Sequence, residues 1–306
     1  MTKPSIVVIG SSNTDMVIKT THLPHPGETI LGGDFFMNAG GKGANQAVAA
    51  ARLGGNVTFF TKVGDDIFGE QARALFEKES IDTSYVLTDK NSPSGVALIT
   101  VDNKGENCIV VAPGANNALS ASDLQLRSSV IENASLIIVQ LEIPLETVEY
   151  ISNLASTAGV KLVLNPAPAC KLSDELLSQI DIITPNQKEA EMLTGITVND
   201  NESAKVAARA LSKKGIKSVI ITLGSSGAVL YHENVFSNVE APVVEPVDTT
   251  AAGDVFNGAL VVALSEGMGM HSAVQFACKA AAISVTRLGA QASAPYRKEI
   301  EDFKLS

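Results

Sequence analysis

The sequence has no extended run of Lys or Arg, and charged residues make up only 18% of its 306 residues. Its net charge of −10 at pH 7 and isoelectric point near 4.9 would repel a polyanion at long range, which disfavours nucleic acid as a partner. An anionic nucleotide would therefore need its charge met locally, by metal ions, single basic residues or helix amino termini.

Long apolar runs and paired cysteines are also lacking. No stretch approaches the ~18 apolar residues of a membrane span, and the apolar run before Gly10 is too short for the core of a signal peptide. We therefore expect a cytoplasmic protein that does not enter a membrane. Cys108, Cys170 and Cys278 are odd in number and widely spaced, so neither a disulfide framework nor a zinc site is predicted.

Short runs rich in Val and Ile alternate with segments of helical periodicity. This rhythm predicts an α/β fold, in which helices cover both faces of a mostly parallel sheet. The expected central strands are Ser5–Ile9, Val57–Lys62, Leu136–Gln140, Lys161–Leu164, Ile180–Ile183 and Ser218–Thr222. The expected helices are Ala44–Leu53, Gly69–Glu79, Leu145–Ala158, Lys188–Leu193 and Ser203–Lys213, and glycines at 54, 159, 195 and 215 are placed to end four of them.

Two segments break this rhythm. Residues 13–38 carry strand-like pieces around a Pro-His-Pro-Gly turn, and residues 94–111 predict a hairpin around the turn Asp102–Gly105. Both alternating sets of this hairpin are apolar, with Val96, Leu98 and Ile109 on one side and Ala97, Ile99, Val101, Cys108 and Val110 on the other. A sheet with two apolar faces needs both faces buried. We expect the main domain and its ligand to bury one face and a second subunit to bury the other. The alternative is a hairpin that simply packs on the core. The predicted domains are a core of residues 1–12, 41–93 and 112–306 and a β-sheet lid of residues 13–40 and 94–111.

The segment Asp248–Asp254, of sequence DTTAAGD, is followed directly by an apolar helical pattern. Its small residues would let the backbone approach a ligand closely, and the free amides at the start of the helix would face an anion such as a transferring phosphoryl group. We call these free amides the anion nest. Asp254, next to the nest, could then accept the proton of an attacking hydroxyl. A plain helix cap is the alternative for a Gly-Asp helix start.

A second segment, Asn38–Gln46, also opens a helix of small residues but lacks the Gly-Lys-Ser/Thr of a Walker motif. Its Lys42, Asn45 and the Gly41 backbone are donors and acceptors suited to sugar hydroxyls. Asp15 lies just beyond the first strand, where open α/β sheets bind ligands, and could accept from two neighbouring hydroxyls. A turn-forming role for Asp15 remains the alternative.

Three further segments follow predicted strands. Glu142 comes just past one of them, and Asn186 and Glu189 lie one turn apart on a new helix, so both can face one ligand or its metal shell. Thr222–Gly227 is a glycine-rich turn suited to a nucleotide. Each segment alone is also compatible with an ordinary turn or a solvated helix face.

Together these segments resemble the phosphofructokinase-B-type carbohydrate kinases over essentially the whole chain. The match includes GGKGAN at 40–45, NPAP at 165–168, PNQKE at 185–189 and TRLGAQ at 286–291. The resemblance implies a three-layer α/β sandwich with a β-sheet lid that closes over the sugar and pairs subunits into a homodimer. It implies Asp254 as the base, Ala251, Ala252 and Gly253 as an anion hole, and Asn13, Asp15, Gly41, Lys42, Asn45 and Glu142 as sugar ligands.

The resemblance also implies the cofactors. ATP would contact Asn186, Thr222, Gly224, Ser225, Gly227 and Gly253, while Glu189 would help to position the phosphate-bound magnesium. An activating potassium ion would lie beside the anion hole at Asp248, Thr250, Ser284, Arg287, Gly289 and Ser293, in part through backbone carbonyls. A potassium ion there would stiffen the loop that forms the nest.

The small number of basic residues near the predicted sugar site narrows the choice of acceptor sugar. A kinase for a phosphorylated sugar would need a cationic clamp, and residues 13–40 offer only Lys19 and two histidines. Ribose, phosphorylated at its 5-hydroxyl, is therefore the leading expectation, with deoxyribose or another small sugar or nucleoside as the alternative. A sugar-binding regulator could dispense with Asp254, which is present, and a nicotinamide dehydrogenase would need a Gly-x-Gly-x-x-Gly turn that Gly10–Asp15 does not supply.

Overall fold

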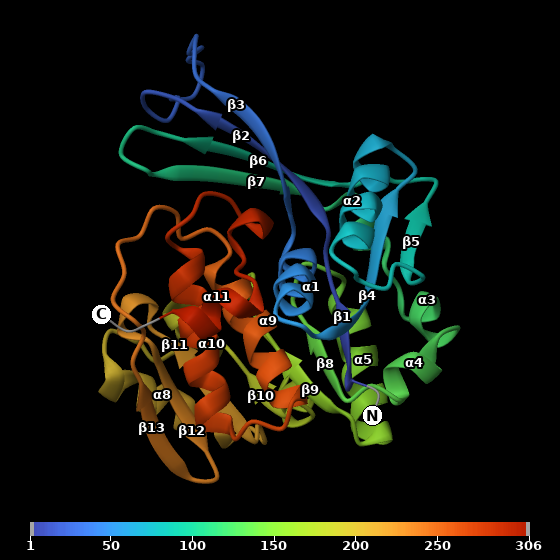
Figure 1. Cartoon of the computed structure of the whole chain (residues 1–306), viewed down its shortest axis with the longest axis vertical. Coiled ribbons are helices and arrows are strands. Elements are labelled where there is room, and N and C mark those ends of the chain that lie inside the picture. The colour runs from blue at the N-terminus through green and yellow to red at the C-terminus, as the bar shows by residue number, and fades with distance from the viewer. Residues whose placement is uncertain (1–2, 304–306) are drawn as a thin grey trace.

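The structure is a computed structural model, and it describes residues 3–303. A nine-stranded sheet forms its centre, in the order β13-β12-β11-β10-β9-β8-β1-β4-β5 (Figure 1). The seven strands from β11 to β5 run parallel, while β12 and β13 are added antiparallel at one edge. In sheet order, the strands are β13 (Val235–Val239), β12 (Ala228–His232), β11 (Ser218–Thr222), β10 (Ile182–Ile183), β9 (Lys161–Leu164), β8 (Leu136–Val139), β1 (Ser5–Ile9), β4 (Asn56–Gly64) and β5 (Val86–Asp89).

All six predicted central strands are present, which confirms the mostly parallel α/β sheet. Strand β10 is shorter than predicted, because the amide of Ile180 donates to Leu177 O in the turn that follows a helix. The edge strands β5 and β13, and β12 next to β13, were not predicted. The pair β12 and β13 forms an antiparallel hairpin, which does not follow the strand–helix alternation used for the prediction.

Both faces of the sheet are covered by helices, as the sequence predicts. Along β1, Ile6 and Val8 pack into one apolar cluster, and Val7 and Ile9 pack into the other. The first cluster is covered by α1 (Lys42–Arg52), α2 (Ile67–Lys78), α9 (Ala252–Ser265), α10 (Met270–Ser284) and α11 (Arg297–Asp302). The second is covered by α3 (Ala121–Gln125), α4 (Ser128–Glu132), α5 (Leu145–Ala158), α6 (Asp174–Ser178), α7 (Gln187–Thr194) and α8 (Asn201–Ser212).

The predicted helix ends follow local backbone chemistry. Gly159 and Gly195 cap α5 and α7 in the left-handed conformation, each with φ of 72°, which a residue with a side chain rarely adopts. Across residues 3–303, no helix combines the length and apolarity that a membrane crossing requires.

A second sheet of four strands lies apart from the first and extends over one end of the core (Figure 1). Its order is β3 (Phe35–Gly40), β2 (Asn13–Lys19), β6 (Gly95–Val101) and β7 (Asn107–Ala112). These strands fall in the two segments that break the strand–helix rhythm. We refer to this sheet below as the lid sheet.

The register of the hairpin β6–β7 corrects one prediction. Ile99 lies opposite Ile109 and Leu98 opposite Val110, so Leu98 shares a face with Val110 rather than with Ile109. The predicted grouping was therefore wrong by one residue in the second strand. Apolar residues still occupy both faces, because a shift of one residue in an all-apolar strand exchanges one apolar set for another.

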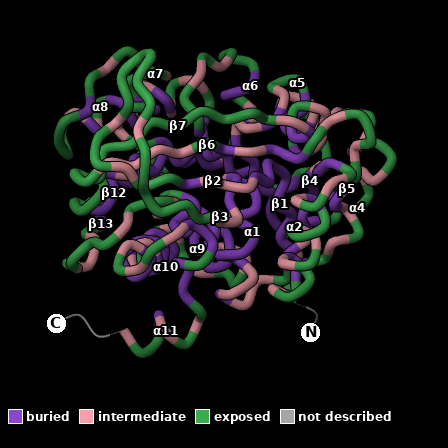
Figure 2. Tube along the Cα trace, turned by 90° about the horizontal axis from the view of Figure 1, so that it is seen from above, coloured by how far each residue is buried: buried purple, intermediate pink, exposed green. Residues whose placement is uncertain are grey.

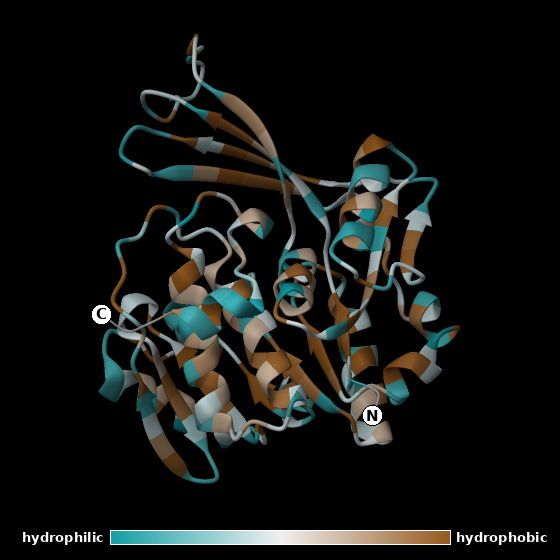
Figure 3. Ribbon diagram, in the orientation of Figure 1, coloured by the Kyte–Doolittle hydropathy of each residue, from teal (hydrophilic) through white to brown (hydrophobic). Residues whose placement is uncertain are grey.

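Several large apolar side chains of the lid sheet are exposed. Figure 2 shows β7 exposed while α1 and α9 in the core are largely buried, and Figure 3 shows apolar stretches along the lid strands. The most exposed are Phe35, Met37, Leu98, Ile109 and Val110. Phe35, Met37, Leu98 and Val110 lie on one face of the sheet, and Ile109 lies on the other. An exposed apolar face of this kind is typical of a surface that another chain or a ligand covers.

Candidate functional site

The carboxyl ends of the parallel strands meet at one edge of the main sheet, below the lid sheet. Ser11 to Asn13 follow β1, Gln140 follows β8, Asn165 follows β9, and Thr184 follows β10. All of these side chains are buried. Ligands of open α/β sheets bind at such an edge, so the predicted location of the site is consistent with the fold.

Asp254 lies in the first turn of α9 and is only 6% exposed. Its Oδ2 accepts a hydrogen bond from Asn45 Nδ2 at 2.9 Å, and its Oδ1 accepts one from Gln46 Nε2 at 3.0 Å. Burial raises the pKa of Asp254, whereas Lys42 and the two amide donors act in the opposite direction. The two adjacent residues of α1 thus fix both oxygens of the carboxylate.

The backbone at the start of α9 is arranged for an anion. Ala251 is held at φ 59°, a conformation that a non-glycine residue seldom adopts, and its carbonyl accepts the first helical bond from Val255. Within residues 3–303, no oxygen accepts a hydrogen bond from the amides of Gly253 or Asp254. Free amides at a helix amino terminus bind anions. The strained residue turns the chain so that these amides are available.

A cavity of about 200 Å³ lies in front of these amides. It is lined by the predicted anion-hole residues and Asp254, together with Lys42 and three residues of the predicted nucleotide side. Its lining residues are Lys42, Asn165, Ala167, Thr184, Asn186, Glu189, Thr222, Thr249, Ala251, Ala252, Gly253, Asp254 and Asn257. The structure therefore brings the predicted base, anion hole and nucleotide segments to one cavity.

Lys42 is the cation of this cavity, and four carboxylates influence it. Burial lowers the pKa of Lys42, but Asp254, Glu142, Glu189 and Asp15 together raise it above the ordinary value. Burial, followed by the charges of Glu142 and Asp254, raises the pKa of Asp15 to about 7. Carboxylates that repel one another gain from a cation or from hydroxyl donors brought by a ligand.

The loop before α1 fits closely against the end of β1. Gly41 has φ of 89°, and a Cβ there would lie 2.7 Å from Asn13 N, so only glycine fits. Glu142 Oε2 accepts from Ser11 Oγ at 2.5 Å and from the backbone amide of Lys42 at 3.1 Å. The predicted sugar residues Asn13, Gly41, Lys42 and Glu142 are thereby held together.

On the nucleotide side, Asn186 and Glu189 form a reciprocal cap of α7. Asn186 Oδ1 accepts from the amide of Glu189 at 2.9 Å, and the Glu189 carboxylate accepts from the amide and from Nδ2 of Asn186, both at 2.8 Å. Asn186 and Glu189 therefore cap this helix, a role that was not predicted from the sequence. Both residues nevertheless line the cavity, and burial raises the pKa of Glu189.

The turn after β11 is less closely tied to the cavity. Thr222 lines it, but Gly224, Ser225 and Gly227 do not, and Gly224 and Ser225 are exposed. Gly227 has a structural reason to be glycine, since its φ is 85° and a Cβ would lie 2.0 Å from Val239 O. Contacts of these three residues with a nucleotide stay a prediction.

The residues predicted to bind potassium lie in two segments, 248–250 and 284–293, and the side chain of Asp248 links the two. Its Oδ1 accepts from the amide of Thr250 and its Oδ2 from the amide of Gly289, each at 2.9 Å. The hydroxyls of Ser284 and Ser293 donate to carbonyls of their own segments. Arg287 forms an ion pair with Glu299 instead of pointing to a ligand, so only its carbonyl could serve a cation.

Four buried amide side chains of the site were not predicted from the sequence, three of them connected with the base and one with Asn13. Gln140 Nε2 donates to Gln46 Oε1 at 2.6 Å, and Gln46 Nε2 donates to Asn165 Oδ1 as well as to Asp254. Asn116 Nδ2 donates to Asn13 Oδ1 at 2.7 Å. Gln46 and Asn165 stand inside the motifs quoted above and could have been found there, whereas nothing in the sequence connects residue 116 with residue 13.

Comparison with known proteins agrees with this geometry. Residues 3–297 match the description "pfkB family carbohydrate kinase". The chain belongs to this family. Among relatives of the pfkB family, a ribokinase of Haemophilus influenzae is 46% identical over 98% of both chains, and a deoxyribokinase of Salmonella typhi is 38% identical over 97% of this chain and 98% of its own. The structure of an Arabidopsis thaliana ribokinase complexed with ribose and ATP covers 99% of this chain and 100% of its own, with 32% identity and a TM-score of 0.92. The ribokinase-like fold expected from the resemblance is confirmed.

Proposed function

We propose that the protein catalyses ATP-dependent phosphorylation of D-ribose at the 5-hydroxyl, giving ribose 5-phosphate and ADP. One observation carries the proposal: the fixed carboxylate of Asp254 faces the same cavity as the free amides at the start of α9 and the cation of Lys42. A base, an anion nest and a cation in one cavity are the parts that phosphoryl transfer to an alcohol requires. The ribokinase relatives support ribose as the acceptor.

On the sugar side, Asn13, Asp15, Gly41, Lys42, Asn45 and Glu142 would hold the pentose. Asp15 would accept hydrogen bonds from two neighbouring hydroxyls, which offsets the repulsion it experiences from Glu142 and Asp254. Asn45 would contact both the sugar and the base, because its Nδ2 already donates to Asp254. This pairing would hold the 5-hydroxyl next to the carboxylate.

In the reaction, the 5-oxygen attacks the terminal phosphorus of ATP, and the bond from that phosphorus to the bridging oxygen of ADP breaks. The hydroxyl proton passes to Asp254, late in the transfer, because a carboxylate is a weak base for an alcohol. Of the predicted anion hole at Ala251–Gly253, the amide of Ala252 already donates to Thr249 O at 3.3 Å. The amides of Gly253 and Asp254 and the ammonium of Lys42 stabilise the charge on the moving phosphoryl group. Asn257 supports this turn, since its Nδ2 donates to Gly253 O at 2.8 Å.

ATP would enter from the side of α7 and β11. Asn186, Thr222 and the turn residues Gly224, Ser225 and Gly227 would contact the nucleotide. Magnesium would arrive with ATP and neutralise phosphate charge. Glu189 would influence its position from the cavity wall, where both carboxylate oxygens already accept from Asn186 but retain further lone pairs.

A potassium ion would fit beside the anion nest, where Asp248 fixes the segments that carry Thr250 and Gly289. Burial raises the pKa of Asp248, but hydrogen bonds from Thr250 and Gly289 and the charge of Lys19 outweigh it, so the pKa is lowered overall. An anionic side chain and nearby carbonyls are oxygen donors suited to an alkali cation. Bound there, the ion would stiffen the loop that shapes the nest.

The exposed apolar face of the lid sheet would pair two subunits into a homodimer. This face carries Phe35, Met37, Leu98 and Val110 and is the one opposite to that of Asp15, so neither the main sheet nor a small sugar could cover it. A cytoplasmic location, where ATP is available and free cysteines stay reduced, completes the proposal.

The test is an ADP-release assay with the purified protein over a panel of pentoses, hexoses, nucleosides and sugar phosphates. D-ribose should give the highest kcat/KM, and the product should be ribose 5-phosphate. The deoxyribokinase relative makes 2-deoxyribose the second candidate. Higher kcat/KM with 2-deoxyribose would replace the substrate in the proposal, and the absence of turnover with every sugar would refute it.

A further inference from the structure

We infer that Asn116 is a positioning residue for the sugar site, which turns the Asn13 side chain so that its amide nitrogen, and not its oxygen, faces the sugar. The inference rests on the proposed function. Asn116 is 1% exposed and lies on the 3₁₀ helix η1 (Gly114–Ala118), which directly follows the last strand of the lid sheet. Asn13 is the first residue of β2 and is 8% exposed.

The orientation of Asn116 is fixed by two bonds to one backbone residue. Its Oδ1 accepts from the amide of Ser12 at 2.9 Å, and its Nδ2 donates to Ser12 O at 3.1 Å. If the Asn116 amide were reversed, its oxygen would face Ser12 O and its nitrogen would face the Ser12 amide, so neither bond could form. The same Nδ2 donates its second hydrogen to Asn13 Oδ1 at 2.7 Å. Asn13 therefore has its oxygen occupied, and its Nδ2 is left as a donor.

Gly95 provides independent support, because it leaves room for this pair. A Cβ at Gly95 would lie 2.2 Å from Asn116 Nδ2 and 2.2 Å from Asn13 Oδ1. Gly95 is also the partner of Asn13 in the parallel pairing of β2 with β6. The backbone of the lid sheet thus makes the space in which the two amides meet.

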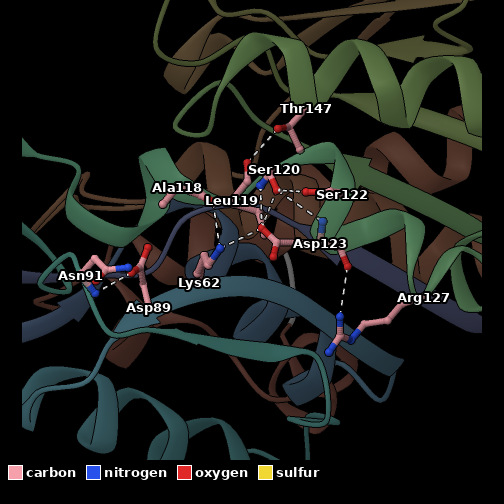
Figure 4. A network of polar contacts seen from close by, with 10 residues as sticks. All are labelled: Lys62, Asp89, Asn91, Ala118, Leu119, Ser120, Ser122, Asp123, Arg127 and Thr147. Carbon is pink, nitrogen blue, oxygen red and sulfur yellow. Dashed lines mark hydrogen bonds and ion pairs between the residues drawn. The ribbon is translucent and has the colours of Figure 1, made fainter.

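The segment that carries Asn116 is anchored at its other end, as Figure 4 shows. Lys62 Nζ donates to Ala118 O at 3.0 Å and forms an ion pair with Asp123 at 2.9 Å. Thr147 Oγ1 donates to Leu119 O at 2.8 Å. A buried amide on a segment held in this way can impose an orientation on its neighbour instead of following it.

The consequence for recognition is a defined polarity. Asn13 and Asp15 are two residues apart on β2, so their side chains leave the same face of the strand. One offers a donor and the other offers acceptors. A hydroxyl group that donates to Asp15 can accept from Asn13 through its lone pair, whereas a carbon without a hydroxyl leaves both protein groups unpaired. The pair therefore selects for a hydroxyl.

The test is Asn116→Asp, with Asn117→Asp as the matched control. Aspartate keeps the acceptor for the amide of Ser12 but removes both donated bonds, so the Asn13 amide is free to turn its oxygen to the sugar. Asn117 is the next residue, is exposed, and undergoes the same change of charge. Binding of D-ribose and of 2-deoxy-D-ribose is measured by calorimetry without ATP, and the KM for ATP is measured in the ADP-release assay with the sugar that binds wild type more tightly.

We expect Asn116→Asp to weaken sugar binding by about 10-fold or more, the usual cost of a mismatched buried polar group, while the KM for ATP stays within about 2-fold. In an Asn13→Ala background, the same change should add less than about 2-fold, because its effect passes through the Asn13 amide. Gly95→Ala should reproduce the loss of sugar binding while residue 116 stays asparagine, because its Cβ would push the two amides apart, and it serves as the test if Asn116→Asp does not fold.

Three results would overturn the inference: equal losses for sugar and ATP, a full additional loss in the Asn13→Ala background, or unchanged sugar binding in Asn116→Asp. The failure of the proposed function would be seen separately, as wild-type protein that binds and phosphorylates neither pentose. In that case Asn13 has no sugar to orient, and the inference falls with the proposal. If wild type prefers 2-deoxyribose, only the substrate changes, and the coupling between Asn116 and Asn13 is read with that sugar.

Discussion

The two ends of the cavity differ in how completely the protein fixes them. At the base end, Asp254 accepts hydrogen bonds at both oxygens from buried amides, and Glu142 is held by a hydroxyl and a backbone amide. At the nucleotide end, Gly224 and Ser225 are exposed and do not line the cavity. The base end is preorganised by contacts within the protein, and so is the Asn186–Glu189 pair on the nucleotide side, whereas the turn at Gly224 and Ser225 would acquire its contacts from the ligand. Substitutions at the two ends should therefore affect different steps.

The largest effect is expected at the base. Asp254→Asn removes the proton acceptor but keeps the size of the side chain, so kcat should fall by about 10²–10⁴-fold. Ribose binding, measured by calorimetry, should stay within a few-fold of wild type. Asp302→Asn, an exposed change on α11, is the control and should leave both quantities unchanged. Substantial turnover by Asp254→Asn would remove this residue from its role.

The second effect tests the amide that holds the base. Gln46→Glu places a carboxylate where an amide now donates to Asp254 Oδ1. A neighbouring negative charge raises the pKa of Asp254 further, so less of it is ionised at a given pH. We expect kcat/KM near pH 7 to fall by about 10-fold. It should recover partly at higher pH, because the rising limb of the pH profile shifts to higher pH. A uniform loss at all pH values would indicate only structural damage.

Asp15 connects the chemistry with stability. Burial raises the pKa of Asp15 to about 7, so between its ordinary pKa and about 7 the native state binds more protons than the unfolded state. The free energy of unfolding of the sugar-free protein then falls as pH rises through that range. Asp15→Asn lacks this titration. Between pH 5 and pH 8, its free energy of unfolding should therefore fall by about 2 kcal/mol less than that of wild type.

Urea unfolding at the two pH values measures this difference, with the exposed Asp34→Asn as the control. Asp15→Asn should also weaken ribose binding by about 10-fold or more, because two acceptor positions for hydroxyls are altered. The same pH dependence of unfolding in Asp15→Asn and wild type would show that Asp15 does not titrate in this range.

The smallest effect is expected at the nucleotide end. Ser225 is exposed and outside the cavity lining, so Ser225→Ala should change the KM for ATP by no more than about 2-fold and leave kcat unchanged. The ADP-release assay measures both. A large fall in kcat would mean that this turn closes over the reacting phosphate, and the contrast between the two ends would not hold.

The sequence predicted the parts of the molecule that depend on local patterns. The strand–helix alternation located the six central strands, and the glycines at 159 and 195 marked two helix ends correctly. The motif around Asp254 predicted a carboxylate at a helix start facing a nest of amides. These features are encoded within a few residues of chain.

The remainder depends on contacts between distant segments. The hairpin register was missed by one residue, because an all-apolar strand gives no signal for its facing side. The bond between Asn116 and Asn13 joins residues 103 positions apart, and no short motif contains both. Asn186 and Glu189 proved to be a helix cap as well as part of the cavity, a combination that sequence spacing alone could not distinguish.

The central claim is that sugar, base and anion nest meet in one cavity. The most direct measurement is a crystal structure of the protein with D-ribose and a non-hydrolysable ATP analogue. The account predicts the 5-hydroxyl within about 2.6–3.2 Å of a carboxylate oxygen of Asp254, with the terminal phosphate on the amide of Gly253. A sugar hydroxyl that faces another group, or a terminal phosphate bound away from the start of α9, would contradict it.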